Sequence, residues 1–129
     1  MNKREHGAHN KGLCDKLCAI GNYNDWVVTT AFYSAIHYID HKIFPFEYKG
    51  QEIKSLDTAF KNTDFSRGNR HDTRAFLVKE KLPLFSTEFR YLMDRCFHAR
   101  YNNYKVAPAV ASNVRLFLDT LISECDQDK

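Results

Sequence analysis

Long apolar runs, glycine and proline are all scarce in this chain of 129 residues, which has five glycines and three prolines. No stretch approaches the roughly 18 apolar residues that a membrane-spanning helix requires. The first residues, MNKREHGAHNKG, are polar and lack the apolar core of a secretory signal. We therefore expect a cytoplasmic protein that makes no contact with a membrane.

The motifs of several enzyme classes are missing as well. There is no G-x-S-x-G turn for a serine nucleophile and no glycine-rich phosphate loop, so P-loop chemistry on nucleoside triphosphates is excluded. Cys96 stands two residues before His98, which places the two side chains on nearly opposite sides of a helix and out of hydrogen-bond reach. We expect neither a serine or cysteine nucleophile nor a bound cofactor.

The four cysteines do not have the spacing of a disulfide framework. Cys14 and Cys18 are one helical turn apart, an arrangement that suits two thiols packed on one helix face better than a zinc site. The sequence therefore predicts reduced thiols, in agreement with a cytoplasmic location.

Charge and composition leave the class of partner open. Nineteen Lys and Arg residues against 16 Asp and Glu residues give a formal net charge of +3, which permits a polyanionic partner without requiring one. Aromatic residues make up 14% of the chain, so the core or an interface is built from large flat side chains. A chain of this length is expected to form one domain with one core.

The most informative segment is residues 25–44, DWVVTTAFYSAIHYIDHKIF, which contains no glycine or proline. Apolar side chains recur at helical spacing on two adjacent faces, which indicates a central helix with partners on both sides. Asp25 is well placed to cap this helix, and Pro45 ends it because the residue before a proline avoids the helical region. His37 lies on the predicted buried surface, where an imidazole must be hydrogen-bonded or functional.

The rest of the chain predicts further helices and no strand. We expect a flexible arm over residues 1–12 and a single domain over residues 13–127, whose first helix is short and ends at Gly21. Residues 45–65 form a polar loop with a helical turn near 54–61. The later helices run from near Arg70 to before Pro83, from Phe85 through Ala99 and from Pro108 to Cys125. The expected fold is all-α, an up-and-down four-helix bundle with an additional short N-terminal helix.

A first candidate site combines basic and aromatic side chains over residues 90–105. Arginine planes and aromatic rings on one element suit phosphate contacts and base stacking. The alternative is a solvated helix face with ordinary ion pairs, such as Arg90 with Asp94 at one turn. The members of this candidate site are Arg90, Arg95, His98, Arg100, Tyr101, Tyr104 and Lys105.

A second candidate site is the segment RGNRHDTR, residues 67–74, at a predicted helix start. The first amide groups and the dipole of a helix add to the arginine charge there, so the segment suits an anion. Arg70, His71 and Arg74 are its candidate residues. His71 can act as a base or an acid because imidazole titrates near neutral pH. The alternative is that His71 caps the helix or bonds a neighbouring element.

A third candidate site is the pattern H-x-x-D-H from His37 to His41. Two imidazoles at positions i and i+4 share a helix face, which is the spacing that zinc hydrolases use. Asp40 stands where the inverted zincin pattern has glutamate, and a third ligand requires His71 or His98 to fold close. The alternative is a His37 that is hydrogen-bonded to a partner helix in the core.

Taken together, DW…FYSAIHYID, the lone His71 before a helix and Y-L…A-R-Y at residues 91–101 resemble the HEPN superfamily over about residues 12–125. This resemblance implies a small prokaryotic helical bundle that is usually a homodimer and often belongs to a toxin–antitoxin, antiviral or stress system. A nucleotidyltransferase-type antitoxin is the partner that such a system would supply. Many members are metal-independent RNases, whose site is an arginine followed four to six residues later by a histidine.

The chain departs from that RNase motif. Arg100 stands where the family arginine is expected, but Tyr104 and Lys105 occupy positions where the histidine would follow. The leading hypothesis is therefore a HEPN-like module that forms a homodimer and binds RNA or a nucleotide with little or no catalysis. Its candidate binding residues are Arg70, Arg74, Arg95, His98, Arg100 and Tyr101.

Three alternatives stay open. One is a metal-independent RNase with a displaced site, in which His71 takes the proton of the RNA 2′-hydroxyl and Arg74 or Arg100 neutralises the phosphate. A second is a metal-binding bundle built on His37 and His41. The third is an interaction protein whose polar loop presents aromatic rings to a partner, or folds them back onto the core.

Overall fold

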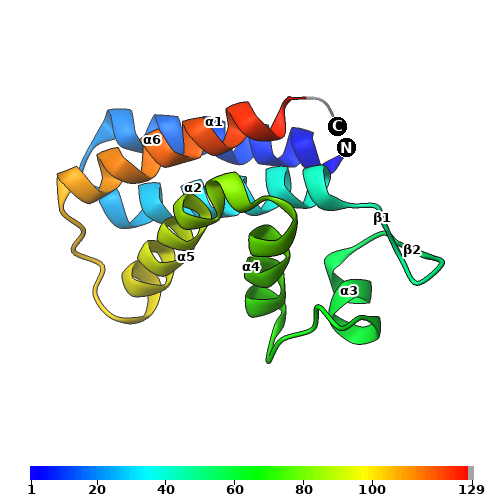
Figure 1. Ribbon diagram of the computed structural model, residues 1–129. Coiled ribbons are helices and arrows are strands. Elements are labelled where there is room, and N and C mark those ends of the chain that lie inside the picture. Colours follow the sequence, from blue (N-terminus) through cyan, green and yellow to red (C-terminus); the bar gives the residue numbers. More distant parts are fainter. Residues whose placement is uncertain (128–129) are drawn as a thin grey trace.

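The computed structural model describes residues 1–127, which form six α-helices, one 3-10 turn and a two-stranded hairpin (Figure 1). The protein is therefore mostly helical, as predicted. No helix within these residues is both long and apolar enough to cross a membrane. In chain order the elements are α1 (Lys3–Ile20), α2 (Asn24–Ile43), β1 (Phe46–Tyr48), β2 (Gln51–Ile53), α3 (Leu56–Asn62), α4 (Arg70–Lys81), η1 (Pro83–Phe85), α5 (Ser86–Tyr101) and α6 (Pro108–Cys125).

Helix α2 is the centre of the fold, and the prediction of a 20-residue central helix is confirmed. Twelve of its residues are buried, and it packs against α1, α5 and α6. Figure 1 shows α1 and α6 running alongside α2, while α5 crosses obliquely and α4 runs across that direction. Helix α4 packs mainly on α3 and α5. The helical class is thus established, and the up-and-down four-helix bundle stays a prediction.

The start of α2 differs from the expected cap. The N-cap residue is Tyr23, and Asp25 lies in the first turn, where its charge complements the helix dipole without forming a side-chain cap. The Asn24 side chain instead donates to the carbonyl oxygen of Val106, 3.1 Å away. This bond ties the start of α2 to the segment that precedes α6.

The flexible arm expected over residues 1–12 is wrong, because these residues belong mostly to α1, which begins at Lys3. The Asn2 side chain accepts a 2.8 Å hydrogen bond from the Glu5 amide, and the Glu5 carboxylate accepts one of 3.4 Å from the Asn2 amide. This reciprocal pair is a capping box, which satisfies two amide groups at the helix start.

A glycine allows the first half of α1 to lie against α2. The Ser34 hydroxyl donates to the carbonyl oxygen of Gly7 at 2.8 Å. A Cβ atom at Gly7 would stand 2.6 Å from a ring carbon of Tyr38, so no larger residue fits without a shift. The contact is made by backbone and glycine, which explains why the polar composition of this segment did not reveal a packed helix.

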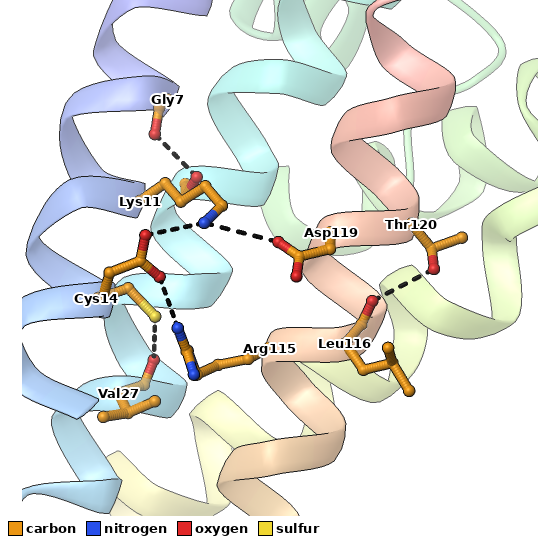
Figure 2. Close-up of polar contacts among 10 residues, drawn as sticks. Gly7, Lys11, Cys14, Val27, Arg115, Leu116, Asp119 and Thr120 are labelled. Atoms are coloured by element: carbon orange, nitrogen blue, oxygen red, sulfur yellow. Dashed lines mark hydrogen bonds and ion pairs between the residues drawn. The ribbon is translucent and has the colours of Figure 1, made fainter. Parts of the chain in front are cut away.

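Ion pairs join α1 to α6 on the side shown in Figure 2. The Lys11 ammonium lies 2.8 Å from Asp15 of its own helix and 3.5 Å from Asp119 of α6. Arg115 of α6 donates to the other oxygen of Asp15 at 2.9 Å. These groups are partly exposed, so each pair contributes only about 0–1 kcal/mol, and the network orients the two helices more than it stabilises them.

The loop over residues 45–65 contains a β-hairpin that the sequence analysis missed. Tyr48 of β1 pairs with Gln51 of β2, and the turn residues Lys49 and Gly50 have φ values of +48° and +80°. Two positive φ values fit a type I′ turn, for which Asn-Gly is the usual signal. The hairpin could not be recognised from a Lys-Gly turn and such short strands. The expected helical turn is present as α3.

The aromatic rings of this loop fold back onto the protein, one of the two outcomes considered. The ring of Phe65 lies 5.7 Å from that of Phe46 and 6.1 Å from that of Phe76 on α4, measured between centroids. The Lys81 ammonium lies 4.0 Å from the centre of the Phe46 ring. The loop therefore packs against α4 through ring contacts.

Candidate nucleic-acid interface

Helices α2, α4 and α5 bring aromatic rings and basic side chains together. The ring centroids of His71 on α4 and Phe97 on α5 are 5.1 Å apart, and those of Phe97 and Tyr101 are 6.2 Å apart. Arg100 of α5 lies between Tyr101 and Tyr33 of α2. We refer to these five residues as the aromatic–cation cluster, and three helices must be in place to form it.

Arg100 is the cation of this cluster. Its guanidinium carbon lies 5.8 Å from the ring centres of both Tyr33 and Tyr101, and its Nη1 atom donates to the Tyr33 hydroxyl oxygen. Among residues 1–127 no carboxylate lies within ion-pair distance of this guanidinium. Arg100 is exposed, so its other donors remain open to an anion from solvent.

His71 stands at the α4 edge of the cluster. Burial, followed by the nearby charge of Arg74, lowers the pKa of His71 below its ordinary value of 6.5, and Asp72 partly opposes this shift. The Phe32 ring lies 6.1 Å away and Phe97 contributes the closer contact. At neutral pH the imidazole is therefore mainly uncharged, the form in which a histidine accepts a proton.

Arg74 does not join the cluster, although the sequence placed it among the catalytic and binding candidates. Its Nε and Nη2 atoms donate to the two carboxylate oxygens of Asp40 on α2 at 2.8 and 2.9 Å. The side chains of Arg74 and Asp40 are only 10% and 6% exposed. This buried bidentate pair gives Arg74 a structural role in joining α4 to α2.

Arg70 is also held by an acidic partner. Its Nε atom donates to Asp57 of α3 at 2.9 Å, a second guanidinium nitrogen bonds the same oxygen, and its guanidinium lies 4.9 Å from the Phe60 ring centre. The Asp57 pKa is lowered first by this bond and then by Lys61. Arg70 thus closes the α3–α4 contact, and its charge is largely compensated there.

Arg95 and His98 lie on another side of α5. Residues five positions apart, such as Arg95 and Arg100, are separated by about 140° around a helix axis. Arg95 and His98 line a small cavity together with Lys105, away from the aromatic–cation cluster. The six binding candidates therefore fall into separate places: two in the cluster, two at this cavity and two in ion pairs.

The metal-site alternative receives no third ligand. The His37 ring stacks on His6 of α1, with centroids 3.7 Å apart and planes 19° from parallel. Burial and then the charge of His6 lower the pKa of His37. No group of three or more His, Cys, Asp or Glu residues within the described chain is placed to hold a metal ion. His37 and His41 therefore lie one turn apart on α2, and the described residues supply no third ligand beside them.

Burial makes Cys96 and Cys125 unreactive thiols. None of the four cysteines in residues 1–127 forms a disulfide, and burial raises the pKa of Cys96 to about 11 and that of Cys125 to about 12. Cys14 donates to the carbonyl oxygen of Val27 at 3.4 Å, as drawn in Figure 2. A thiol with so high a pKa is a poor nucleophile at neutral pH.

Two members of the cluster, Tyr33 and Phe97, are not among the candidate residues of the sequence analysis. Both are half-buried. The one available signal was the hydroxyl of Tyr33, because a phenol on a mostly buried helix requires a polar partner. That this partner is Arg100 follows only from the crossing of α2 and α5.

Comparison of the chain with protein-family models, with curated proteins and with solved structures gives no match.

Proposed function

We propose that this chain binds RNA or a nucleotide at the aromatic–cation cluster. The observation that carries the proposal is the state of Arg100, whose guanidinium is positioned by a hydroxyl and two rings and lacks a carboxylate partner in the described chain. An arginine held in this way keeps donors for a phosphate oxygen. Tyr101, which is 75% exposed, offers a ring face beside it.

The combination favours a single-stranded or mononucleotide ligand over a duplex. Stacking of a base on an exposed aromatic ring contributes about 1–3 kcal/mol and requires that the base be unpaired. The guanidinium would bind the phosphate next to the stacked base, and the net charge of +3 adds weak long-range attraction. Arg100 would thus fix the backbone while Tyr101 holds the base.

A second candidate function is metal-independent RNA cleavage at the same surface, favoured by the lowered pKa of His71. A neutral imidazole would take the proton of the 2′-hydroxyl, whose oxygen then forms a bond to phosphorus. The bond from phosphorus to the 5′-oxygen breaks, and that oxygen takes a proton from solvent. Arg100 would neutralise the charge that develops on the phosphate oxygens. The products would be a 2′,3′-cyclic phosphate and a 5′-hydroxyl end.

The proposal also includes the finer features that the sequence patterns and the HEPN resemblance imply. These are an up-and-down four-helix bundle with an added N-terminal helix, a cytoplasmic homodimer, and a role in a toxin–antitoxin, antiviral or stress system with a nucleotidyltransferase-type partner. Light scattering after size-exclusion chromatography tests the dimer directly. A single species of 15.1 kDa, the mass of one chain, would remove the homodimer from the proposal.

The binding test is fluorescence anisotropy with labelled single-stranded RNA at low salt. Arg100→Gln and Tyr101→Ala should each weaken binding, and Arg100→Gln should reduce the slope of log affinity against log salt by about 0.7, the share of one phosphate contact. Lys16→Gln is the charge-matched control, because Lys16 is exposed on α1, an element that contributes no residue to the cluster.

Two results would contradict the proposal: undetectable RNA and nucleotide binding at low salt, or equal losses in Arg100→Gln and the Lys16→Gln control. Cleavage is tested separately without metal. His71→Ala should abolish cleavage while RNA affinity persists, and unchanged cleavage in His71→Ala would exclude His71 as the base.

A further inference from the structure

A second group of basic side chains surrounds a small cavity beside α5, away from the aromatic–cation cluster. The cavity has a volume of about 70 Å³. Three of the residues that line it are Arg95, His98 and Lys105, and the others are apolar: Val106, Ala107 and Val110. No carboxylate is among these lining residues, so the cavity has a strongly one-sided charge.

Arg95 is the strongest indication that this cavity favours an anion. Its side chain is half-buried, yet it forms no ion pair or side-chain hydrogen bond with another residue of the described chain. A partly desolvated cation without a counter-ion is unfavourable, and an anion in the cavity would remove that cost.

His98 is oriented so that it can assist. Its Nδ1 atom lies 3.3 Å from the side-chain nitrogen of Asn102, one turn further along α5. An amide nitrogen only donates, so Nδ1 accepts this bond and the neutral ring carries its proton on Nε2. The ring then offers an N–H donor in either protonation state, which suits an anionic ligand and not a metal ion.

We propose that the Arg95–His98–Lys105 cavity binds one phosphate group. Its volume of about 70 Å³ corresponds to roughly two liquid water molecules, which leaves room for a small polyatomic anion and none for a nucleobase. Arginine supplies paired donors to phosphate oxygens, and lysine adds a point charge. The site goes beyond the function proposed above, because none of its residues belongs to the aromatic–cation cluster.

The surroundings of the cavity indicate a phosphate carried by a nucleotide. Lys105, Val106 and Ala107 also line a neighbouring cavity of about 380 Å³, whose other lining residues are Tyr104, Asn22, Asn24 and the acidic Asp25. That volume lies within the about 300–1,000 Å³ typical of ligand pockets. Tyr104 is 68% exposed and offers a ring face to a base. The phosphate comes either from a free nucleotide or from the end or interior of an RNA strand.

The test is an NMR titration of ¹⁵N-labelled protein with inorganic phosphate, uridine and uridine monophosphate in parallel. Phosphate and the monophosphate should shift the Arg95 Nε–Hε and His98 ring signals saturably, while uridine should leave both signals in place. Arg95→Gln should weaken monophosphate binding about tenfold, a change of about 1.4 kcal/mol. Arg90→Gln is the matched control, since Arg90 is an exposed arginine of the same helix that lines a different cavity.

Lys105→Gln, on the loop before α6, provides a second variant if Arg95→Gln does not fold, and it should also weaken binding. RNA oligomers with and without a 5′-phosphate separate the sources: a preference for the phosphorylated oligomer identifies a terminal phosphate, and equal binding identifies an internal one. No saturable shift with phosphate and monophosphate, or equal affinity in Arg95→Gln and Arg90→Gln, would overturn the proposal. RNA binding lost only in Arg100 variants would leave the proposed function intact without this site.

Discussion

The Arg74→Met substitution should make the protein much easier to unfold and should leave RNA binding by the folded molecule unchanged. Both guanidinium bonds to Asp40 are short, at 2.8 and 2.9 Å, and both side chains are almost fully buried. Removing one partner of such a buried pair costs about 3–5 kcal/mol. For a chain of 129 residues, each kcal/mol moves Tm by about 4 °C, so a decrease of about 12–20 °C is expected.

The assay is urea denaturation followed by circular dichroism, with thermal unfolding as a second probe. The double variant Asp40→Leu/Arg74→Met removes both charges and should recover most of the loss, because the penalty arises from the uncompensated carboxylate. Lys79→Met is the matched control on α4, since Lys79 is exposed and its loss should change stability by less than about 0.5 kcal/mol.

Two outcomes would refute this reasoning. Arg74→Met could prove as stable as the parent protein, which would mean that the pair with Asp40 is not buried in solution. The second is that Arg74→Met stays folded and loses RNA affinity as strongly as Arg100→Gln, which would mean that Arg74 contributes to RNA binding.

Two further predictions concern α1 and its contact with α2. Gly7→Ala should lower the free energy of unfolding by about 1–3 kcal/mol, because the new Cβ would stand 2.6 Å from the Tyr38 ring. Gly12→Ala should instead stabilise the helix by about 0.5–1 kcal/mol, because a Cβ there would meet no atom beyond its own stretch of helix within 4 Å. Equal effects of the two substitutions in urea denaturation would contradict the close packing at Gly7. Burial and then His6 lower the pKa of His37 below 6.5, so the unfolded chain binds the proton first and stability should decrease as pH falls below that value. His37→Phe should make this pH dependence shallower, and an unchanged slope in urea titrations between about pH 7 and 5 would count against the shifted pKa.

The central helix could be predicted because its signal is local. Residues 25–44 combine the absence of helix breakers with apolar residues on two faces, and both properties can be read from the sequence. Helix α1 was not predicted over residues 1–12 because its packing depends on Gly7, which gives no hydrophobic signal in the sequence. The capping box of Asn2 and Glu5 was the one sequence signal for this helix start. The hairpin was not predicted because its turn has lysine at the position where asparagine is the usual sequence signal.

The candidate site was only partly predictable, for a different reason. Arg100 and Tyr101 are neighbours in sequence, so their combination was visible, but Tyr33 reaches them only through the crossing of two helices. Sequence spacing reveals where positive charge accumulates and does not reveal which arginine has a buried carboxylate partner. Asp40 lies 34 residues before Arg74, and nothing in the helical periodicity links the two.

The most direct measurement of the central claim is an NMR titration of ¹⁵N-labelled protein with a single-stranded RNA at low salt. The Arg100 Nε–Hε signal and the backbone amides of Tyr33 and Tyr101 should shift saturably, with a dissociation constant equal to that from fluorescence anisotropy. Saturable shifts confined to helices that do not form the aromatic–cation cluster, with the Arg100 signal unmoved, would contradict the account.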